Sequence, residues 1–287
     1  QFFGLWAFPY PQRGSFRSIL NQIDAVERAV AANPSDLALC RNHADWRHAR
    51  AHDRIAVFLG VEGAHALEGE VDNVLAFARR GVRYLGLGHF TENQCCCSAG
   101  PFGGNQNIGL RPFGYEVLDA CAASGVILDL AHISRCGFFD VIRHNTANRQ
   151  TPLIVSHTGL SGVTPHWRNI DDDQIRSVAD SGGVIGIINS RHFLGGATLE
   201  AMMRHFDHLR NVGGDNVLAL GSDHDGFARA VRGYSHVGEL PNLVQAMLAR
   251  GYSPELVTKV LSGNVLRVLA AVPPRAPAPA LHLVSEK

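Results

Sequence analysis

The stretch IAVFLGVEGAH, residues 55–65, decides the fold class of this chain. Its first seven residues are all apolar or glycine, and a carboxylate, Glu62, comes directly after them. An unbroken apolar run of this length is typical of a strand that is buried on both faces, as in a parallel sheet covered by helices. A carboxylate at the end of such a strand is costly to bury unless a partner compensates its charge. Alone, Glu62 would indicate only a salt bridge, so its meaning depends on how the other strands end.

The composition excludes several classes of function. The chain of 287 residues carries 26 basic and 26 acidic side chains, so its charge offers no attraction for nucleic acid or an anionic membrane. No run of about eighteen apolar residues predicts a membrane-spanning helix, and no signal peptide is visible. The six cysteines form no C-x-x-C pair, and this favours a reducing compartment. We expect a cytoplasmic protein with no nucleic-acid partner, and a homodimer is left open; so is a targeting segment upstream of Gln1.

Predicted strands and helices alternate along the whole chain. The strands are expected at residues 1–10, 55–61, 82–88, 126–130, 152–156, 183–188 and 216–220. The helices are expected at residues 15–32, 42–51, 71–80, 112–124, 134–144, 171–180, 197–212, 240–250 and 254–261, with a continuation through 264–270. Regular alternation of this kind predicts an α/β fold with a parallel sheet.

Seven strand–helix units are one short of a (β/α)8 barrel of the TIM type, a fold of about 250 residues. We expect the first strand of the barrel to be missing from this chain and to lie upstream of Gln1. A doubly wound open sheet is the alternative, but no G-x-G-x-x-G motif lies between a strand and a helix here. The expected organisation is a barrel domain over residues 1–271 and a mobile tail, rich in Pro and Ala, over residues 272–287.

Ionisable side chains follow five of the seven predicted strands: Glu62, His89, His132, His157 and Asp223. In a barrel the carboxyl ends of the strands meet on one face, where active sites are built. Imidazoles and a carboxylate are the ligands of catalytic zinc sites, which keep one position open for water and lower the pKa of that water. The pattern therefore predicts a metal-dependent hydrolase, with Glu62 as the natural bridge between two ions about 3.5–4 Å apart.

Short motifs surround these strand ends in a fixed order: GVEGAH (60–65), GVRYL (81–85) followed by His89, LDLAH (128–132), VSH (155–157), Arg168-Asn169, GSDHDG (221–226), and Tyr252 with GNVLR (263–267). In order and approximate spacing, over about residues 1–271, they resemble the membrane (renal-type) dipeptidase family, metallopeptidases of the M19 class. The resemblance implies zinc-dependent hydrolysis of dipeptides by metal-activated water. It also implies tolerance of D-residues at the C-terminal position of the substrate.

The resemblance implies the metal ligands residue by residue. Glu62 would bridge two zinc ions, and His132 and His157 would hold the second ion. The family's first strand carries a His-x-Asp pair for the first ion, and no such pair precedes Glu62 in this sequence. For the span as printed we therefore expect at most one well-bound zinc ion and weak activity.

The resemblance also implies three contacts with the dipeptide. His89 would contact the scissile carbonyl and stabilise the oxyanion. Arg168 would hold the C-terminal carboxylate, a role that suits guanidinium geometry. Asp223 would hold the amino group and help with proton transfer.

Two other functions remain open at this point. One is a different amidohydrolase-type activity on a lactone or another amide, and the other is a non-catalytic relative that lacks the first metal site. A carboxylate clamp at Arg168 favours the dipeptide, and retention of five site residues argues against loss of catalysis. For His65 we expect a supporting hydrogen bond rather than metal ligation. For Asp129 a structural pairing and a supporting role near the metal are equally expected.

Overall fold

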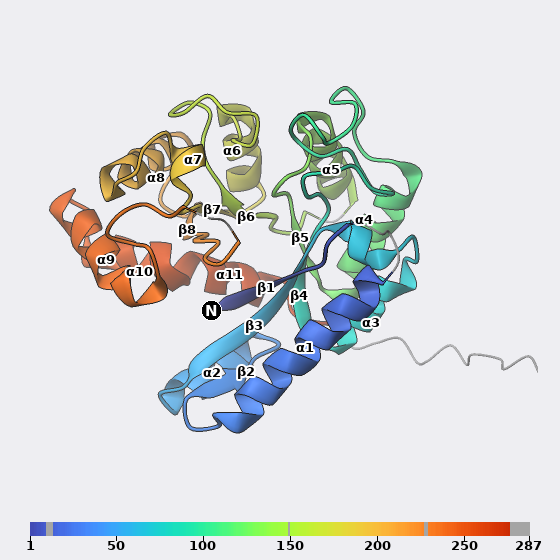
Figure 1. Ribbon diagram of the computed structural model, residues 1–287, viewed down its shortest axis with the longest axis horizontal. Coiled ribbons are helices and arrows are strands. Elements are labelled where there is room, and N and C mark those ends of the chain that lie inside the picture. Colours follow the sequence, from blue (N-terminus) through green and yellow to red (C-terminus); the bar gives the residue numbers. More distant parts are fainter. Residues whose placement is uncertain (10–13, 149, 227–228, 276–287) are drawn as a thin grey trace, which may run out of the picture.

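A curved parallel sheet forms the centre of the molecule, and helices surround it (Figure 1). The structure is a computed structural model that describes residues 1–9, 14–148, 150–226 and 229–275. The strands run in the order β1-β3-β4-β5-β6-β7-β8, with β2 paired to the first half of β3, and every pairing is parallel. Their bounds are β1 Phe2–Trp6, β2 Leu37–Leu39, β3 Ile55–Glu62, β4 Val82–Gly86, β5 Ile127–Asp129, β6 Ile154–Thr158, β7 Val184–Ile187 and β8 Leu218–Leu220. This is the predicted α/β architecture of the TIM type.

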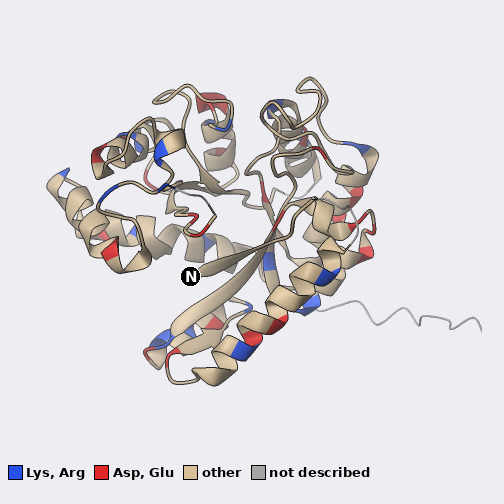
Figure 2. Ribbon diagram, viewed as in Figure 1, with Lys and Arg blue, Asp and Glu red and all other residues tan. Residues whose placement is uncertain are grey.

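The helices alternate with the strands, and their bounds lie close to the predicted ones. They are α1 Ser15–Ala32, α2 His43–Ala51, η1 Ala64–Leu67, α3 Asp72–Arg79, α4 Pro112–Ser124, α5 Arg135–Asn148, α6 Asp172–Asp180, α7 Arg191–Leu194, α8 Leu199–Gly213, η2 Val237–Glu239, α9 Leu240–Ala249, α10 Pro254–Thr258, η3 Lys259–Gly263 and α11 Asn264–Ala271. Charged side chains lie mainly on these helices and on the loops (Figure 2). Among the described helices, none combines the length and apolar character needed to cross a membrane.

Both faces of the sheet are buried along β3 to β8, which explains why these strands are mostly continuous apolar runs. Side chains on the inner face form one apolar cluster with α11, and it contains Phe58, Tyr84, Ile127, Ile154, Val184, Ala219 and Val268. Their neighbours one position along each strand belong to a second cluster beneath the outer helices, and it contains Leu59, Leu85, Leu128, Val155, Ile185 and Leu218. Because strand side chains alternate between faces, each strand contributes to both clusters.

Four short elements were not predicted: β2, η1, α7 and η2. The strand β2 is three residues long, and its half-buried residues pair with Ile55, Ala56 and Val57 of β3. The helix α7 is a single turn of four residues, and Gly195 follows it in the left-handed conformation. Elements this short show no hydrophobic period of their own, because their stability comes from tertiary pairing.

Two predictions, a further strand and a tail from residue 272, concern the edges of the sheet and the end of the chain. In the part of the chain that is described, the main path of paired strands runs from β1 to β8 and these two do not pair with each other, so the expected further strand stays a prediction. After α11, Val272 is buried and its carbonyl accepts a hydrogen bond of 2.6 Å from Nη2 of buried Arg83. The amide of Arg275 donates to the carbonyl of Ser124. Residues 276–287, the rest of the predicted tail, lie outside the described residues, and the division at residue 271 stays a prediction.

A prediction about stability follows from the inner face. Gly60 of β3 is the register partner of Gly4 in β1, and both face Tyr84 of β4. A Cβ at Gly60 would lie 2.0 Å from ring carbons of the buried Tyr84, whereas a Cβ at Gly4 would lie 3.5 Å from its hydroxyl oxygen. We expect Gly60→Ala to lower the free energy of unfolding by about 1–3 kcal/mol, as overpacking does, when measured by urea denaturation.

Gly4→Ala is the matched control for this prediction. Its added methyl group meets an ordinary van der Waals contact. Alanine also costs less backbone entropy than glycine in a strand, so this variant should be neutral or more stable by up to about 1 kcal/mol. Similar losses for the two variants would contradict the packing argument.

Candidate metal and substrate site

Polar side chains replace apolar ones on the inner face as each strand approaches its carboxyl end. In β3 the inward positions pass from Phe58 through Gly60 to Glu62, two residues at a time. In β5 the inward residue after Ile127 is Asp129. The same two-residue period in every strand stacks the inward side chains in layers. The layer at the carboxyl ends of the strands is therefore polar, and this is the end of the sheet at which the sequence predicts the site.

Glu62, His132 and His157 converge at this end of the barrel. Oε1 of Glu62 lies 3.0 Å from Nε2 of His132 and 3.3 Å from Nε2 of His157. The two imidazole Nε2 atoms are 2.9 Å apart. Both imidazoles are buried, and the Glu62 side chain is only 18% exposed. His157 is part of β6, whereas His132 follows β5 and has a φ of 66°, a left-handed conformation that costs a non-glycine residue about 1–3 kcal/mol.

The three residues fit a divalent metal ion. One ligand atom from each lies within 4.8 Å of the others, and they form the one such group of three or more His, Cys, Asp or Glu residues among those described. Two imidazole nitrogens and a carboxylate oxygen are a donor set that zinc uses in catalytic sites. Their electrostatics agree: although burial alone opposes ionisation, the adjoining imidazoles of His132 and His157 hold the pKa of Glu62 well below its usual range. The carboxylate is therefore charged and available as a ligand.

His89 lies beside this cluster, in the loop after β4. Its Nε2 is 4.0 Å from Oε1 of Glu62, and its ring packs against the rings of Trp6 and His132 at centroid distances of 5.1 and 4.8 Å. Burial lowers the pKa of His89 to about 4, although the charge of Glu62 opposes this shift. The imidazole is therefore neutral at neutral pH and has one N–H group to donate.

Arg168 brings a buried positive charge to the same region. Its side chain is 2% exposed, and its Nη2 donates a hydrogen bond of 2.8 Å to the carbonyl of His157. A longer contact of 3.5 Å joins Nη1 to Oγ1 of Thr158, and Nε is buried without a hydrogen-bond partner among the described residues. Burial lowers the pKa of Arg168 to about 10, so the guanidinium stays charged at neutral pH. A buried cation with unused donor capacity is suited to bind an anionic group.

Asp223 completes the set of predicted residues. It follows β8 in a left-handed conformation with a φ of 55°, the second such non-glycine residue in the site. Burial raises the pKa of its carboxyl group and the charge of Glu62 adds to the rise, while His157 and Arg168 oppose it. The pKa of each of the six predicted site residues is shifted by the charge of at least one other member of the set, so all six lie in one electrostatic environment at the carboxyl ends of the strands.

Two residues outside the predicted set support it. His65 does not join the metal group: its Nε2 lies 2.8 Å from the carbonyl oxygen of Ala7, which ties the loop after β3 to the end of β1. Ser156, for which the sequence predicted no role, lies between Asp129 and His157 and contacts both side chains. The signal for Ser156 was its position two residues after Ile154, which places it on the inner face.

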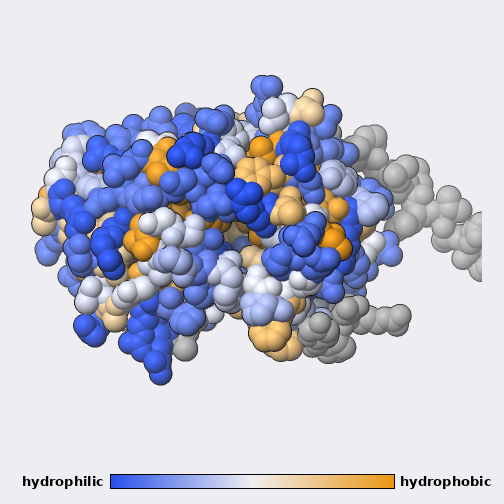
Figure 3. Space-filling view, turned by 90° about the horizontal axis from the view of Figure 1, so that it is seen from above, coloured by the Kyte–Doolittle hydropathy of each residue, from blue (hydrophilic) through white to orange (hydrophobic). Residues whose placement is uncertain are grey.

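Aromatic rings surround the approach to the site. Phe90 packs against His132 at 4.9 Å and against Trp167 at 6.0 Å, measured between ring centroids. Trp167 is 45% exposed, and on the β1 side Phe8 is 66% exposed and packs against Trp6. The wider surface seen in Figure 3 is largely hydrophilic with separate apolar patches. An apolar rim around a charged centre suits a small substrate that has charged ends and an apolar side chain.

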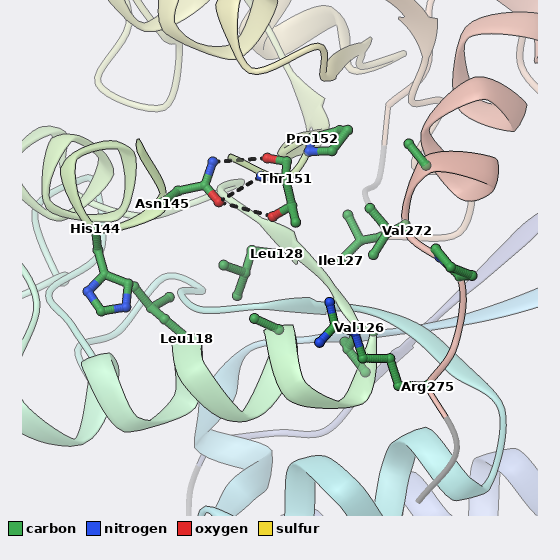
Figure 4. A pocket seen from close by; sticks show the side chains of 14 residues that line it. Leu118, Val126, Ile127, Leu128, His144, Asn145, Thr151, Pro152, Val272 and Arg275 are labelled. Atoms are coloured by element: carbon green, nitrogen blue, oxygen red, sulfur yellow. Dashed lines mark hydrogen bonds between the residues drawn. The ribbon is translucent and has the colours of Figure 1, made fainter. Parts of the chain in front are cut away.

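A pocket at the opposite end of β5 does not share this chemistry. It is lined mainly by apolar residues of α4, β5 and the segment after α11, including Leu118, Ile127 and Val272 (Figure 4). Its amide side chain, Asn145, is bonded to Thr151 through three hydrogen bonds of 2.9, 3.0 and 3.3 Å. No cluster of metal ligands among the described residues faces it. The chemistry of the molecule is therefore concentrated at the carboxyl ends of the strands.

Comparison with known proteins agrees with this geometry. The sequence model of the family described as "Membrane dipeptidase (Peptidase family M19)" matches residues 1–278. A Klebsiella pneumoniae protein, described as an uncharacterized protein in the pqqA 5' region, is 31% identical over 261 residues, which are 88% of this chain and 94% of that protein.

Solved structures show the same relationship. A metallopeptidase from Rhodobacter sphaeroides, liganded with a phosphinate mimic of the dipeptide L-Ala-D-Ala, has a TM-score of 0.85 at 26% identity, covering 94% of this chain and 86% of that one. A dipeptidase described as a metallopeptidase of family M19 has a TM-score of 0.86 at 27% identity, covering 94% and 85%. The chain described here belongs to the membrane dipeptidase family, peptidase family M19.

Proposed function

We propose that this protein is a zinc-dependent dipeptidase that acts on free dipeptides. The observation that carries the proposal is the buried, charged guanidinium of Arg168 beside the converging group of Glu62, His132 and His157. A lactone has no carboxylate for such a group to bind, so the arrangement favours a dipeptide over a lactone. Membership of a dipeptidase family supports the same substrate class.

Three residues would hold the metal, and others would hold the substrate. Glu62, His132 and His157 are the proposed ligands, and a zinc ion bound there supplies Lewis acidity and lowers the pKa of a water molecule. Arg168 binds the substrate carboxylate through its free N–H groups. This contact fixes the C-terminal end of the dipeptide relative to the proposed metal ligands.

Two further residues contact the scissile carbonyl and the amino end of the substrate. The neutral His89 donates its N–H to the carbonyl oxygen, where negative charge develops in the transition state. Asp223 accepts hydrogen bonds from the substrate ammonium group and receives or returns a proton at its carboxylate oxygens. A cationic anchor and an anionic anchor in one site match the two charged ends of a free dipeptide.

The stereochemistry of the substrate is a further part of the proposal. The Rhodobacter sphaeroides relative is described with a mimic of L-Ala-D-Ala, so we propose that D-residues are accepted at the C-terminal position here. The test is a comparison of L-Ala-L-Ala, L-Ala-D-Ala and their C-terminal amides, with product amines measured after zinc is added to chelator-treated protein. Zinc-dependent hydrolysis of the free dipeptides supports the proposal. Hydrolysis of lactones or amides without hydrolysis of free dipeptides would overturn it.

Metal content is a second prediction for the same site. We expect one zinc ion per chain bound by Glu62, His132 and His157, measured by elemental analysis after dialysis, because these residues are the one converging group in the described part of the chain. Two retained ions per chain would contradict this stoichiometry.

We also propose that the protein is a homodimer, which sedimentation analysis tests. A reducing compartment, the cytoplasm, is proposed because all six cysteines are free.

A further inference from the structure

A chain of hydrogen bonds runs from a buried carboxylate to one of the proposed metal ligands. Asp129 is 1% exposed, and its Oδ2 accepts a hydrogen bond of 2.6 Å from the hydroxyl of Ser156. Oγ of Ser156 is 2.9 Å from Nδ1 of His157. The other ring nitrogen of His157, Nε2, faces Glu62 and His132. Ser156 therefore connects Asp129 to the back of the imidazole that faces the metal position.

The direction of this chain is set by the number of protons available. Oδ1 of Asp129 accepts two backbone N–H groups, from Ala131 at 3.0 Å and from Ser156 at 2.8 Å. The hydroxyl of Ser156 has a single proton, which it donates to Oδ2, so its oxygen has only lone pairs to offer His157. Nδ1 of His157 must then carry the ring proton. Nε2 has a free lone pair as a result, which is the form of imidazole that binds a metal.

We propose that Asp129 and Ser156 are positioning residues that hold His157 in its Nδ1–H tautomer and thereby strengthen metal binding. The proposal rests on the metal site of the proposed function, but not on its substrate. The matching atom of the other proposed imidazole ligand, Nδ1 of His132, is buried with no hydrogen-bond partner among the described residues. Control of the tautomer in this site is therefore concentrated at His157.

The substitution Asp129→Asn tests the direction of the chain. The backbone N–H groups of Ala131 and Ser156 require an acceptor where Oδ1 lies, so the new amide nitrogen takes the place of Oδ2. That nitrogen is a donor and turns the hydroxyl of Ser156 toward Nδ1 of His157, which must then offer a lone pair. The ring proton moves to Nε2, and the ligand atom is blocked. A substitution of nearly the same shape should thus weaken zinc binding more than the deletion Ser156→Ala.

The experiment measures zinc affinity by competition with a chromophoric chelator. We expect the dissociation constant to rise about 10-fold for Ser156→Ala and about 100-fold for Asp129→Asn, the range found for residues that support metal ligands. Ser181→Ala is the control, because it removes a half-buried hydroxyl contact to the amide of Leu153 just before the amino end of β6 and should leave the affinity unchanged. Unchanged affinity in both site variants, or an equal loss in the control, would overturn the proposal.

A second measurement tests the tautomer without any metal or substrate. Protein labelled with ¹⁵N-histidine and freed of metal is examined by NMR at about pH 9, well above the ordinary imidazole pKa of about 6.5. The wild-type spectrum should show the Nδ1–H form of His157, and Asp129→Asn should show the Nε2–H form. The same tautomer in both proteins would overturn the proposal. Dipeptidase activity enters neither measurement, so an inactive protein with these properties would refute the proposed function alone.

Discussion

Glu62→Gln is expected to lower zinc affinity by about 100-fold or more and to lower kcat/KM for dipeptides at least as much. Oε1 of Glu62 lies within 3.3 Å of both proposed imidazole ligands, so the carboxylate is the centre of the group. Glutamine keeps the shape but removes the negative charge that compensates a divalent ion. Changes in residues that only support a metal ligand already cost about 10- to 100-fold, and a ligand itself should cost more. Chelator competition measures the first effect, and steady-state kinetics at a fixed zinc concentration that saturates the wild type measure the second.

The control for this prediction is Glu68→Gln, six residues further along the chain. Oε1 of Glu68 accepts a hydrogen bond of 3.1 Å from the amide of Phe16 in the first turn of α1, and a glutamine oxygen can keep that bond. The same chemical change outside the site should leave zinc affinity unchanged. Excess zinc should restore part of the activity of Glu62→Gln if the loss is one of affinity. A Glu62→Gln protein that binds zinc as tightly as the wild type would remove Glu62 from the ligand set.

The main strands of this fold could be predicted because burial on both faces leaves a plain mark in the sequence. Phe58 packs into the apolar cluster on the inner face, and Leu59 packs into the cluster beneath the outer helices. The sequence of β3 is therefore an unbroken apolar run and not an alternation of apolar and polar residues. The strand β2 shows no such mark, since its three residues are half-buried and are defined by pairing with β3. The length of an element and the burial of its residues therefore determined whether it could be predicted from the sequence.

The candidate site was predictable for a related reason. Glu62, His132 and His157 interrupt or follow apolar runs, where an ionisable residue is conspicuous, and parallel strands bring their carboxyl ends together. Ser156 was not conspicuous, because serine is common in loops and strand ends and its role depends on which atom faces which. The 2.6 Å contact with Asp129 and the 2.9 Å contact with His157 exist only once strands β5 and β6 are in register. Hydrogen-bond direction is thus a property of the assembled sheet.

Arg168→Met is expected to lower kcat/KM for free dipeptides by about 30- to 5,000-fold. This range corresponds to about 2–5 kcal/mol, the usual cost of removing one partner from a buried, hydrogen-bonded charge pair. The buried guanidinium is held by the carbonyl of His157 and lies in the field of Glu62 and Asp223, so the substrate carboxylate would meet a positioned cation. Most of the loss should appear as a higher KM, because the carboxylate is bound in both the ground state and the transition state. Initial rates over a range of L-Ala-D-Ala concentrations measure both constants.

Substrate amides separate this role from a structural one. A dipeptide amide lacks the carboxylate, so the wild-type enzyme should hydrolyse it poorly, and Arg168→Met should hydrolyse it about as well as the wild type does. Arg83→Met is the matched variant, since Arg83 is also a buried arginine that donates a hydrogen bond to a backbone carbonyl. That carbonyl belongs to Val272, which follows α11 and is not part of the candidate site. This variant should lose stability without changing the ratio of the two substrates. Equal losses on the free dipeptide and its amide in Arg168→Met would mean that Arg168 only supports the fold around His157, and the substrate class would have to be reconsidered.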